Sequence, residues 1–336
     1  MDVRLSPEQR ALRDSAVQLV GRLGPGTVVD LADEERRAKL DAAIDAAGWR
    51  ELRSDADDGE PWASAVEVAI VAEELAYGVA DAPFLGATLA ADLRRRAGAP
   101  AAATPETIGL SADLGSLADG ADGMLAVDAA GSTTAIVVLG DQLGTVKLTT
   151  GEVRADLTRS MADPAPSAIA VAVPGGRLTE DDHQASTALG LAITCADLVG
   201  TMRGAIDLAT GYAAERRQFG RPVGSFQAVQ HLLADALVAM EGARSTALHA
   251  AWAVDALPSA DALAAGALAK AWCSRAARSV CETAIQVHGG IGNTWECLAH
   301  VHLRRALLSI DILGGIGPSL DRALDHNGIG GGDGLR

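Results

Sequence analysis

A dense group of side chains that could bind a ligand lies at residues 215–227, where a helix is predicted to end. Three arginines, Arg216, Arg217 and Arg221, fall within six positions and flank Phe219. Glycines and a proline in the same stretch predict a tight turn into the next helix. Because guanidinium groups bind phosphate in bidentate geometry, this turn could clamp a phosphorylated ligand. The alternative is that the arginines only balance the dipole at the helix C-terminus.

A second segment, 286–296, places Gly289, Gly290 and Gly292 within four positions. Glycine has no side chain, so the backbone can approach a ligand closely there. The spacing is not G-x-G-x-x-G, and the segment follows a predicted helix rather than a strand, which argues against a dinucleotide-binding unit. A ligand-binding loop and a plain turn between two helices both remain open.

The sequence gives little support for a metal site, a catalytic nucleophile or a disulfide framework. His300 and His302 are two positions apart and diverge by about 200° on a helix, so they cannot share a metal ion. The sequence contains no H-E-x-x-H, Walker or G-x-S-x-G motif. The four cysteines are Cys195, Cys273, Cys281 and Cys297. They are too few and too scattered for a disulfide framework, which favours a reducing compartment.

The composition of the chain limits which partners it can bind and in which cellular compartment we expect it. The 336 residues carry a formal net charge of −16, which opposes binding to nucleic acid or to an anionic membrane. The first residues are charged throughout and contain no apolar core of a signal peptide. We find no uninterrupted apolar stretch of about 18 residues, so we predict a cytoplasmic protein without a membrane span.

Three kinds of segment must position these loops. Residues 1–100 read as helical, beginning at a capping signal in which Ser6 precedes Pro7 and Gln9. Further helices are predicted at 31–47, 63–77 and 85–97. Residues 101–180 change to short β-type runs separated by turn residues, which predicts a small and mostly antiparallel β domain. The predicted strands are Gly123–Val127, Thr134–Leu139 and Ala168–Val173.

The remaining chain is helical again from 184 to 326. A stripe at spacings of 3, 4, 4 and 3 is typical of a bundle helix, and its members are Phe226, Val229, Leu233, Leu237 and Met240. Ser259, which follows Pro258, is the predicted cap of the next helix. The glycine-rich residues 327–336 predict a flexible tail. The order of segments predicts an α+β multidomain chain, in which scarce aromatics (3%) require a core of small side chains.

The two loops, in this order and on this plan, resemble the acyl-CoA dehydrogenase family, flavoproteins that oxidise an acyl-CoA to the 2-enoyl-CoA. The likeness covers most of the chain. It rests on GWREL at 48–52, AEEL at 72–75, DLTR at 156–159, RRQFG at 216–220 and HGGIGNTWE at 288–296. The Thr-Trp-Glu form of the last motif resembles actinobacterial members found in heteromeric steroid side-chain dehydrogenases. The resemblance implies a C-terminal four-helix bundle and a shortened middle domain.

In this family FAD lies across a subunit interface. The resemblance implies that five residues contact a flavin bound mainly by a neighbouring subunit, and these are Arg216, Phe219, Gln227, Gln286 and Gly290. Arg216 would pair with the pyrophosphate, Phe219 would supply apolar contact, and Gly290 would let the backbone reach the ligand.

This sequence also departs from the family. The middle-domain loop with Thr-Glu-Pro and Gly-Ser-Asp, and the Lys-x-Trp-Ile segment, are absent from residues 101–180. Leu313 stands where the catalytic Glu is usual, and Gly190 stands at the alternative position. Neither can take a proton from the α carbon of a thioester. No catalytic residue is therefore assigned, and Asp311 and Asp197 are weak candidates because they lie near the two positions without aligning with them.

Three functions remain open. The first is a degenerate subunit of a heterotetramer with two copies of each chain, whose homologous partner carries the catalytic Glu. The second is a self-sufficient homomeric dehydrogenase that uses a displaced carboxylate. The third is a non-enzymatic scaffold or regulatory subunit without flavin. For the first two, the resemblance implies an acyl-CoA substrate, with steroid side-chain CoA favoured, and an electron-transfer flavoprotein as the electron acceptor.

Overall fold

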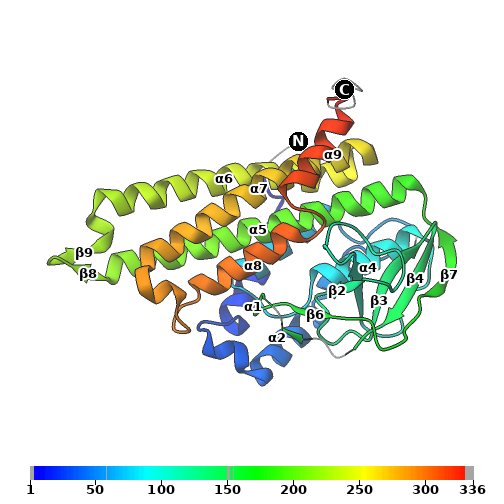
Figure 1. The fold of residues 1–336 in the computed structure, drawn as a ribbon, viewed down its shortest axis with the longest axis horizontal. Helices are drawn as coiled ribbons and strands as arrows, with labels where there is room; N and C mark the ends of the chain where they lie inside the picture. Colours follow the sequence, from blue (N-terminus) through cyan, green and yellow to red (C-terminus); the bar gives the residue numbers. More distant parts are fainter. Residues whose placement is uncertain (1–3, 58, 150–151, 154, 330–336) are drawn as a thin grey trace.

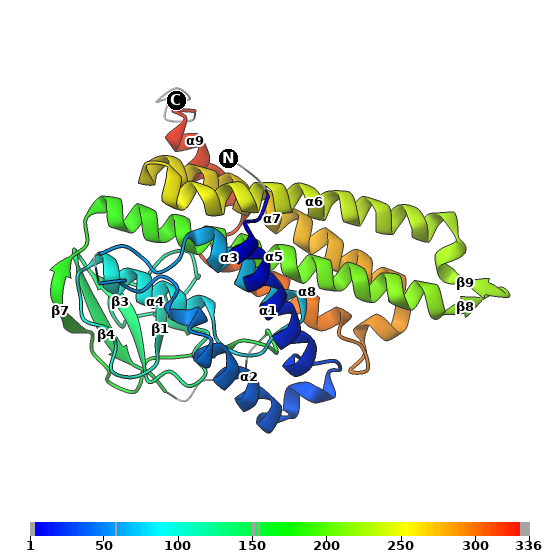
Figure 2. The same ribbon diagram turned by 180° about the vertical axis from the view of Figure 1, so that it is seen from behind.

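The computed structural model describes residues 4–57, 59–149, 152–153 and 155–329. Long helices form the body of the molecule, a β-sheet lies at one end of it, and a short hairpin projects from the other end (Figure 1). The first helices cross the back of the bundle (Figure 2). The predicted α+β order of helices, strands and helices is confirmed. The predicted tail falls outside the described residues from 330 onward.

The N-terminal part contains four α-helices. They are α1 (Pro7–Leu23), α2 (Glu34–Ala46), α3 (Ala65–Tyr77) and α4 (Leu85–Arg96), with 3-10 turns at Val29–Ala32 and Trp49–Glu51. The predicted capping box at the start of α1 is present, because the Ser6 hydroxyl accepts the Gln9 N–H and the Gln9 side chain accepts the Ser6 N–H. α2 begins three residues later than predicted, because the Asp33 side chain accepts the Arg36 N–H and caps it.

The middle part is a seven-stranded sheet in the order β5-β6-β2-β1-β3-β4-β7. The strands are β1 (Glu106–Leu110), β2 (Leu125–Val127), β3 (Thr134–Leu139), β4 (Gln142–Lys147), β5 (Glu152–Val153), β6 (Ser160–Ala162) and β7 (Val171–Arg177). β1 and β3 are parallel, and the other described pairings between strands of this sheet are antiparallel. The sequence therefore predicted β3 exactly and β2 and β7 within a few residues, but missed the other four strands.

The C-terminal part is built on α5 (Glu180–Glu215), which packs against α3, α6, α7 and α8. The others are α6 (Gln227–Ala256), α7 (Ser259–His288), α8 (Ala299–Asp311) and α9 (Ile316–His326). In the described chain, α5 alone is long and apolar enough to cross a membrane, but 94% of its apolar window is buried inside the protein, as in a core helix. Ser259 does not cap α7, because its hydroxyl donates to Asp181 and Gln184 on α5.

Small residues let α3 and α5 approach closely, as the scarcity of aromatics predicted. A methyl group added at Gly200 on α5 would lie 2.0 Å from the Glu73 carbonyl oxygen on α3. We therefore expect Gly200→Ala to lower the free energy of unfolding by about 2–3 kcal/mol in urea titrations, because the backbones must separate. Gly211→Ala, on the same helix with open space around it, is the control and should stabilise by up to about 1 kcal/mol. Equal effects of the two substitutions would contradict close packing as the cause.

Candidate functional site

The three parts of the chain meet at a polar crevice. Two arginines donate to Asp197 on α5. Arg159, directly before β6, does so with an N–O distance of 2.6 Å, and Arg305 on α8 with one of 2.7 Å. Arg159 also pairs with Asp128 at 3.4 Å, and Ser309 donates to Asp197 at 2.7 Å. Arg305 further donates to the Ala80 carbonyl oxygen, which ties the N-terminal part to the other two.

Asp197 acts as a buried counterion in this cluster. Burial alone would raise the pKa of Asp197, but the charges of Arg159 and Arg305 outweigh it and hold that pKa below its ordinary value. Both carboxylate oxygens accept hydrogen bonds from arginine or Ser309. A carboxylate that is ionised, buried and fully hydrogen-bonded is poorly placed to receive a proton from a substrate.

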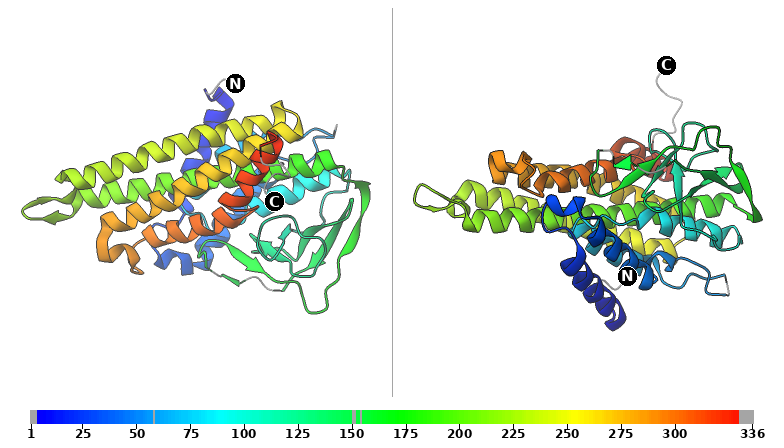
Figure 3. Two further views of the ribbon diagram at one scale, coloured as in Figure 1. Left: turned by 45° about the horizontal axis from the view of Figure 1, so that its top comes forward. Right: turned by 90° about the horizontal axis from the view of Figure 1, so that it is seen from below.

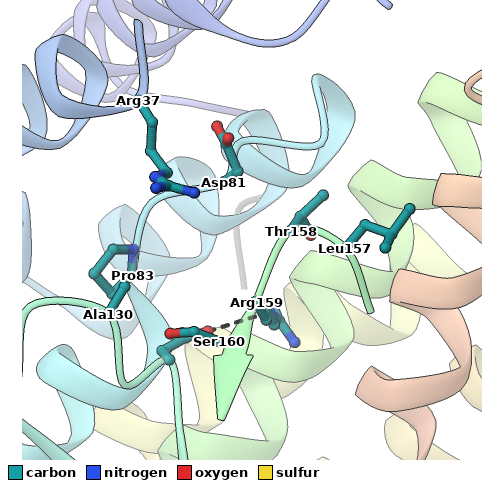
Figure 4. Close-up of a pocket in the computed structure, with 9 residues that line it drawn as sticks. Arg37, Asp81, Pro83, Ala130, Leu157, Thr158, Arg159 and Ser160 are labelled. Carbon is teal, nitrogen blue, oxygen red and sulfur yellow. Dashed lines mark ion pairs between the residues drawn. The ribbon is translucent and has the colours of Figure 1, made fainter. Parts of the chain in front are cut away.

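The crevice leaves little free volume. Figure 4 shows its outer part, where Arg37 and Asp81 stand on one side and Thr158 and Arg159 on the other. This cavity measures about 40 Å³, and the inner one beside Asp197 measures about 10 Å³. Sites for cofactors and drug-sized ligands occupy about 300–1,000 Å³. A flavin ring therefore does not fit into this crevice as it stands.

The two positions that hold the catalytic Glu in the resemblance touch each other. A methyl group added at Gly190 would lie 2.3 Å from Leu313 Cδ1, so the Leu313 side chain occupies the space in front of Gly190. Leu313 has a φ of 60° and is buried, and its N–H donates to the Leu114 carbonyl oxygen at 2.7 Å. The Arg322 guanidinium donates to the Leu313 carbonyl oxygen at 2.7 Å. The turn is held from both sides, and the apolar side chain of Leu313 fills the space in front of Gly190.

Asp311, the other carboxylate considered as a base, lies elsewhere. It ends α8 and is exposed, in an outer groove that it shares with Arg275 and Arg278 of α7. It does not line either cavity of the crevice. The structure thus does not bring Asp311 and Asp197 together.

The arginine hairpin, residues 216–222, is the most prominent exposed feature. β8 (Arg217–Gln218) and β9 (Arg221–Pro222) pair and connect α5 to α6, and the hairpin extends beyond the end of the bundle in both views of Figure 3. Phe219 is 92% exposed at its tip with a φ of 51°. Arg216, at the start of the hairpin, and Gln227, the first residue of α6, are exposed as well. A large apolar side chain held out in a strained conformation is typical of a binding surface.

The glycine loop, residues 289–296, lies at the same end of the bundle (Figure 1). Gly289–Asn293 form a 3-10 turn between α7 and α8, and Gln286 and Gly290 are exposed. The ring of His288 stacks on Tyr212 of α5 at 4.6 Å, which joins the last turns of α5 and α7. All five residues predicted to contact a flavin are therefore exposed at this end, away from the sheet and the crevice.

An apolar groove beside the hairpin was not predicted. It has a volume of about 510 Å³ and lies between α5 and α6, where Ile206, Ala213, Leu233 and Leu237 line it. Leu237 belongs to the helical stripe read from the sequence but is 47% exposed. That stripe was predicted to lie on a bundle helix, and periodicity alone could not show that Leu237 stays exposed at the groove.

No cluster of three or more metal-ligating side chains occurs in the part of the chain that the structure describes. His302 points into the interface of α8 with α5, against Gly204, and is buried. His300 is also buried, with its ring edge-on to Trp295. Both histidines are thus packing residues.

His302 should make stability depend on pH. Burial, with a smaller contribution from Arg305, lowers the pKa of His302 from 6.5 to about 3. Below pH 6.5 His302 becomes protonated in the unfolded chain but stays neutral in the folded chain. The free energy of unfolding therefore falls as the pH falls. We expect this group to cost about 2 kcal/mol between pH 6.5 and pH 5, measured by urea unfolding. His302→Gln should remove this contribution to the pH dependence of the free energy of unfolding. His249→Gln, at an exposed position, should leave that pH dependence unchanged. The same pH dependence in both variants would show that His302 is not its cause.

Comparison with known proteins agrees with this architecture. A family model, "Acyl-CoA dehydrogenase, C-terminal domain", matches residues 186–317. Acyl-CoA dehydrogenase IpdE2 of Mycobacterium tuberculosis is 32% identical over 330 residues, which are 91% of this chain and 93% of that protein. In the ChsE4-ChsE5 complex from Mycobacterium tuberculosis, a chain superposes with a TM-score of 0.79 at 20% identity, covering 98% of this chain and 99% of that one. A variant of the Tcur3481-Tcur3483 steroid ACAD gives a TM-score of 0.77 at 21% identity, covering 96% and 98%. These structures share its fold, and the relation to IpdE2 over nearly the whole length shows that the chain belongs to the acyl-CoA dehydrogenase family.

Proposed function

We propose that this chain is the non-catalytic subunit of a heteromeric acyl-CoA dehydrogenase, whose homologous partner carries the catalytic Glu and most of the flavin site. The observation that carries the proposal is the closed crevice of this chain. Leu313 packs against Gly190 where a base would stand, and the free volume beside Asp197 is about 10 Å³. Proton abstraction from an acyl-CoA needs both a base and space for the acyl chain.

The exposed residues at the hairpin end of the bundle support the proposal that this chain completes a flavin site held mainly by the partner. Arg216 binds the pyrophosphate of the partner's FAD, and Phe219 covers an apolar part of it. Gly290 lets the backbone of the glycine loop approach the cofactor, with Gln227 and Gln286 as hydrogen-bonding side chains. Covering Phe219 removes apolar surface from water, which explains why a side chain that is 92% exposed is held at the tip of the hairpin.

FAD is the cofactor of the acyl-CoA dehydrogenase family, and the chemistry that it would supply in the complex is acceptance of a hydride from the acyl group. The substrate that we propose is an acyl-CoA with a steroid side chain. Support for it comes from the Thr-Trp-Glu motif and from the shared fold with a steroid ACAD. The shared fold with a chain of the ChsE4-ChsE5 complex supports a two-chain assembly. We further propose that an electron-transfer flavoprotein receives the electrons and that the complex is cytoplasmic.

Expression of this chain alone and with its homologous partner tests the proposal. The chain alone should purify colourless and inactive, and the complex should contain one FAD for each pair of different subunits. Acyl-CoA should reduce the flavin of the complex only. Stoichiometric FAD and turnover from this chain alone would contradict the proposal, and a colourless complex would instead favour a scaffold or regulatory subunit.

A further inference from the structure

The last helix of the described chain turns its large apolar side chains toward solvent. α9 packs on α7, and its buried residues are the small Ser319 and Ala323. Its larger residues Ile316, Leu320 and Leu324 are 39%, 44% and 41% exposed. A surface helix ordinarily turns its large apolar residues toward the core. The reversed orientation indicates that another protein surface covers the outer side of α9.

α9 is held in this orientation near both of its ends. The Arg322 guanidinium donates to the Leu313 carbonyl oxygen at 2.7 Å and to the Gly115 carbonyl oxygen at 3.0 Å. At the end of α9, His326 Nε2 lies 3.1 Å from a carboxylate oxygen of Asp261, in the first turn of α7. Because these contacts fix the rotation of α9 about its axis, the exposed apolar residues cannot simply turn inward.

α7 extends the same apolar surface. Leu268 and Trp272 are 53% and 48% exposed, and together with Arg275 they recur every three or four positions, so they lie on one side of α7. Ile316 lines the same outer groove as Arg275, which joins the exposed sides of the two helices. α8 and α9 lie on the side of the bundle opposite to α1 (Figure 3). We call this the front surface, and its apolar members are Leu268, Trp272, Ile316, Leu320 and Leu324.

The charges on the exposed side of α7 fit a second copy of the same surface. Asp261 lies seven residues before Leu268 and Arg275 seven residues after it, so each is two helical turns, or about 10 Å, from Leu268. Arg275 makes no hydrogen bond or ion pair with any residue that the structure describes. A two-fold axis through Leu268, perpendicular to α7, brings Asp261 of each copy opposite Arg275 of the other. The same axis places Trp272 opposite Ala264, whose small side chain leaves room for the indole.

We propose that two copies of this chain meet through the front surface, with their α7 helices antiparallel and Leu268 at the two-fold axis. The contact removes the apolar members of the front surface from water. The two pairs of Asp261 with Arg275 fix the direction and register of the helices. The inference goes beyond the proposed function, because it concerns two identical chains and does not depend on which chain carries the base or the flavin. In a heteromeric enzyme this contact joins two pairs of different subunits.

Size-exclusion chromatography with light scattering tests the proposal on the full chain by itself. At micromolar concentration the chain should have twice the mass of a single chain. Leu268→Glu should be monomeric, because two like charges meet at the axis, and its circular dichroism and thermal melting should match the wild type. Val17→Glu, at a similarly exposed position on α1, should stay dimeric. A monomeric wild-type chain would overturn the proposal. If Leu268→Glu then also failed to bind the homologous partner, the front surface would belong to that partner.

A cross-link locates the two-fold axis. The four native cysteines are buried. Leu268→Cys places a thiol next to its own copy, so mild oxidation of the dimer should give a covalent dimer on a non-reducing gel. Val17→Cys, on the opposite side of the bundle, should not cross-link. A dimer in which Leu268→Cys does not cross-link, or in which both variants cross-link equally, would exclude an axis at this residue.

Charge reversal tests the register of the two α7 helices. Asp261→Arg and Arg275→Asp should each weaken the dimer about tenfold or more, because like charges then face each other. The double variant exchanges the signs and should bind its copy within about threefold of the wild type, as sedimentation equilibrium measures. Single variants without effect, or a double variant no better than either, would refute the antiparallel register. In the complex with the homologous partner, the double variant should keep the wild-type flavin content and rate of flavin reduction. Failure of this proposal and failure of the proposed function are therefore observed separately.

Discussion

A complex that contains Arg216→Ala is expected to assemble but to bind FAD about 100-fold more weakly, a loss of roughly 2.7 kcal/mol. In the proposed complex this guanidinium makes a charge-assisted contact with the pyrophosphate of the partner's cofactor. Removing it leaves a phosphate charge without its counterion at an interface that excludes water. The measurement is the dissociation constant of FAD from the purified complex, followed by flavin fluorescence.

The same substitution should leave this chain itself intact. Arg216 is exposed, and its backbone N–H and carbonyl oxygen make the hydrogen bonds with Tyr212 and Val223. The free energy of unfolding of the isolated chain should therefore change by no more than about 0.5 kcal/mol. Arg217→Ala, one residue further along the same exposed hairpin, is the matched control for a general loss of positive charge. Wild-type FAD affinity in the Arg216 variant, or an equal loss in both variants, would refute the assignment.

Local signals predicted the helices well because their causes are local. The capping box of Ser6 and Gln9 and the apolar spacing within a single helix lie within a few residues of each other. The missed strands depend on partners far along the chain. β4 contains Gly144 and begins with Gln142, so it has little strand propensity of its own, yet it pairs with β3 and β7. Pairing of this kind cannot be derived from periodicity.

In the candidate site, too, the features built from neighbouring residues were predicted, and those built from distant segments were not. A tight turn at 216–222 was predicted from residues that adjoin in sequence, and the structure shows a short exposed hairpin there. The closure of the crevice was not predicted, because Arg159, Asp197 and Arg305 come from three separated segments. The comparison with the family motif indicated that Gly190 and Leu313 had replaced a carboxylate, but only the packing shows that these two residues touch.

The two carboxylates considered as bases should respond to substitution in opposite ways. Asp197→Asn is expected to lower the free energy of unfolding by about 3 kcal/mol, because Arg159 and Arg305 lose their shared buried counterion. Asp311→Asn should change it by less than about 0.5 kcal/mol, because that side chain is exposed. Urea titration of the two variants at the same pH measures the difference, and equal stabilities would contradict the role given to Asp197.

Asp311→Asn in the assembled complex then distinguishes a displaced base from an absent one. If the proton acceptor belongs to the partner, this variant should bind FAD normally and its flavin should be reduced by acyl-CoA at the wild-type rate. A base, in contrast, is needed in the same step as hydride transfer, and its loss would slow flavin reduction by about 100-fold or more while FAD stays bound. Because Asp311 is exposed and does not line the crevice, a slow variant could not be attributed to unfolding. That result would assign the chemistry to this chain and exclude its role as the non-catalytic subunit.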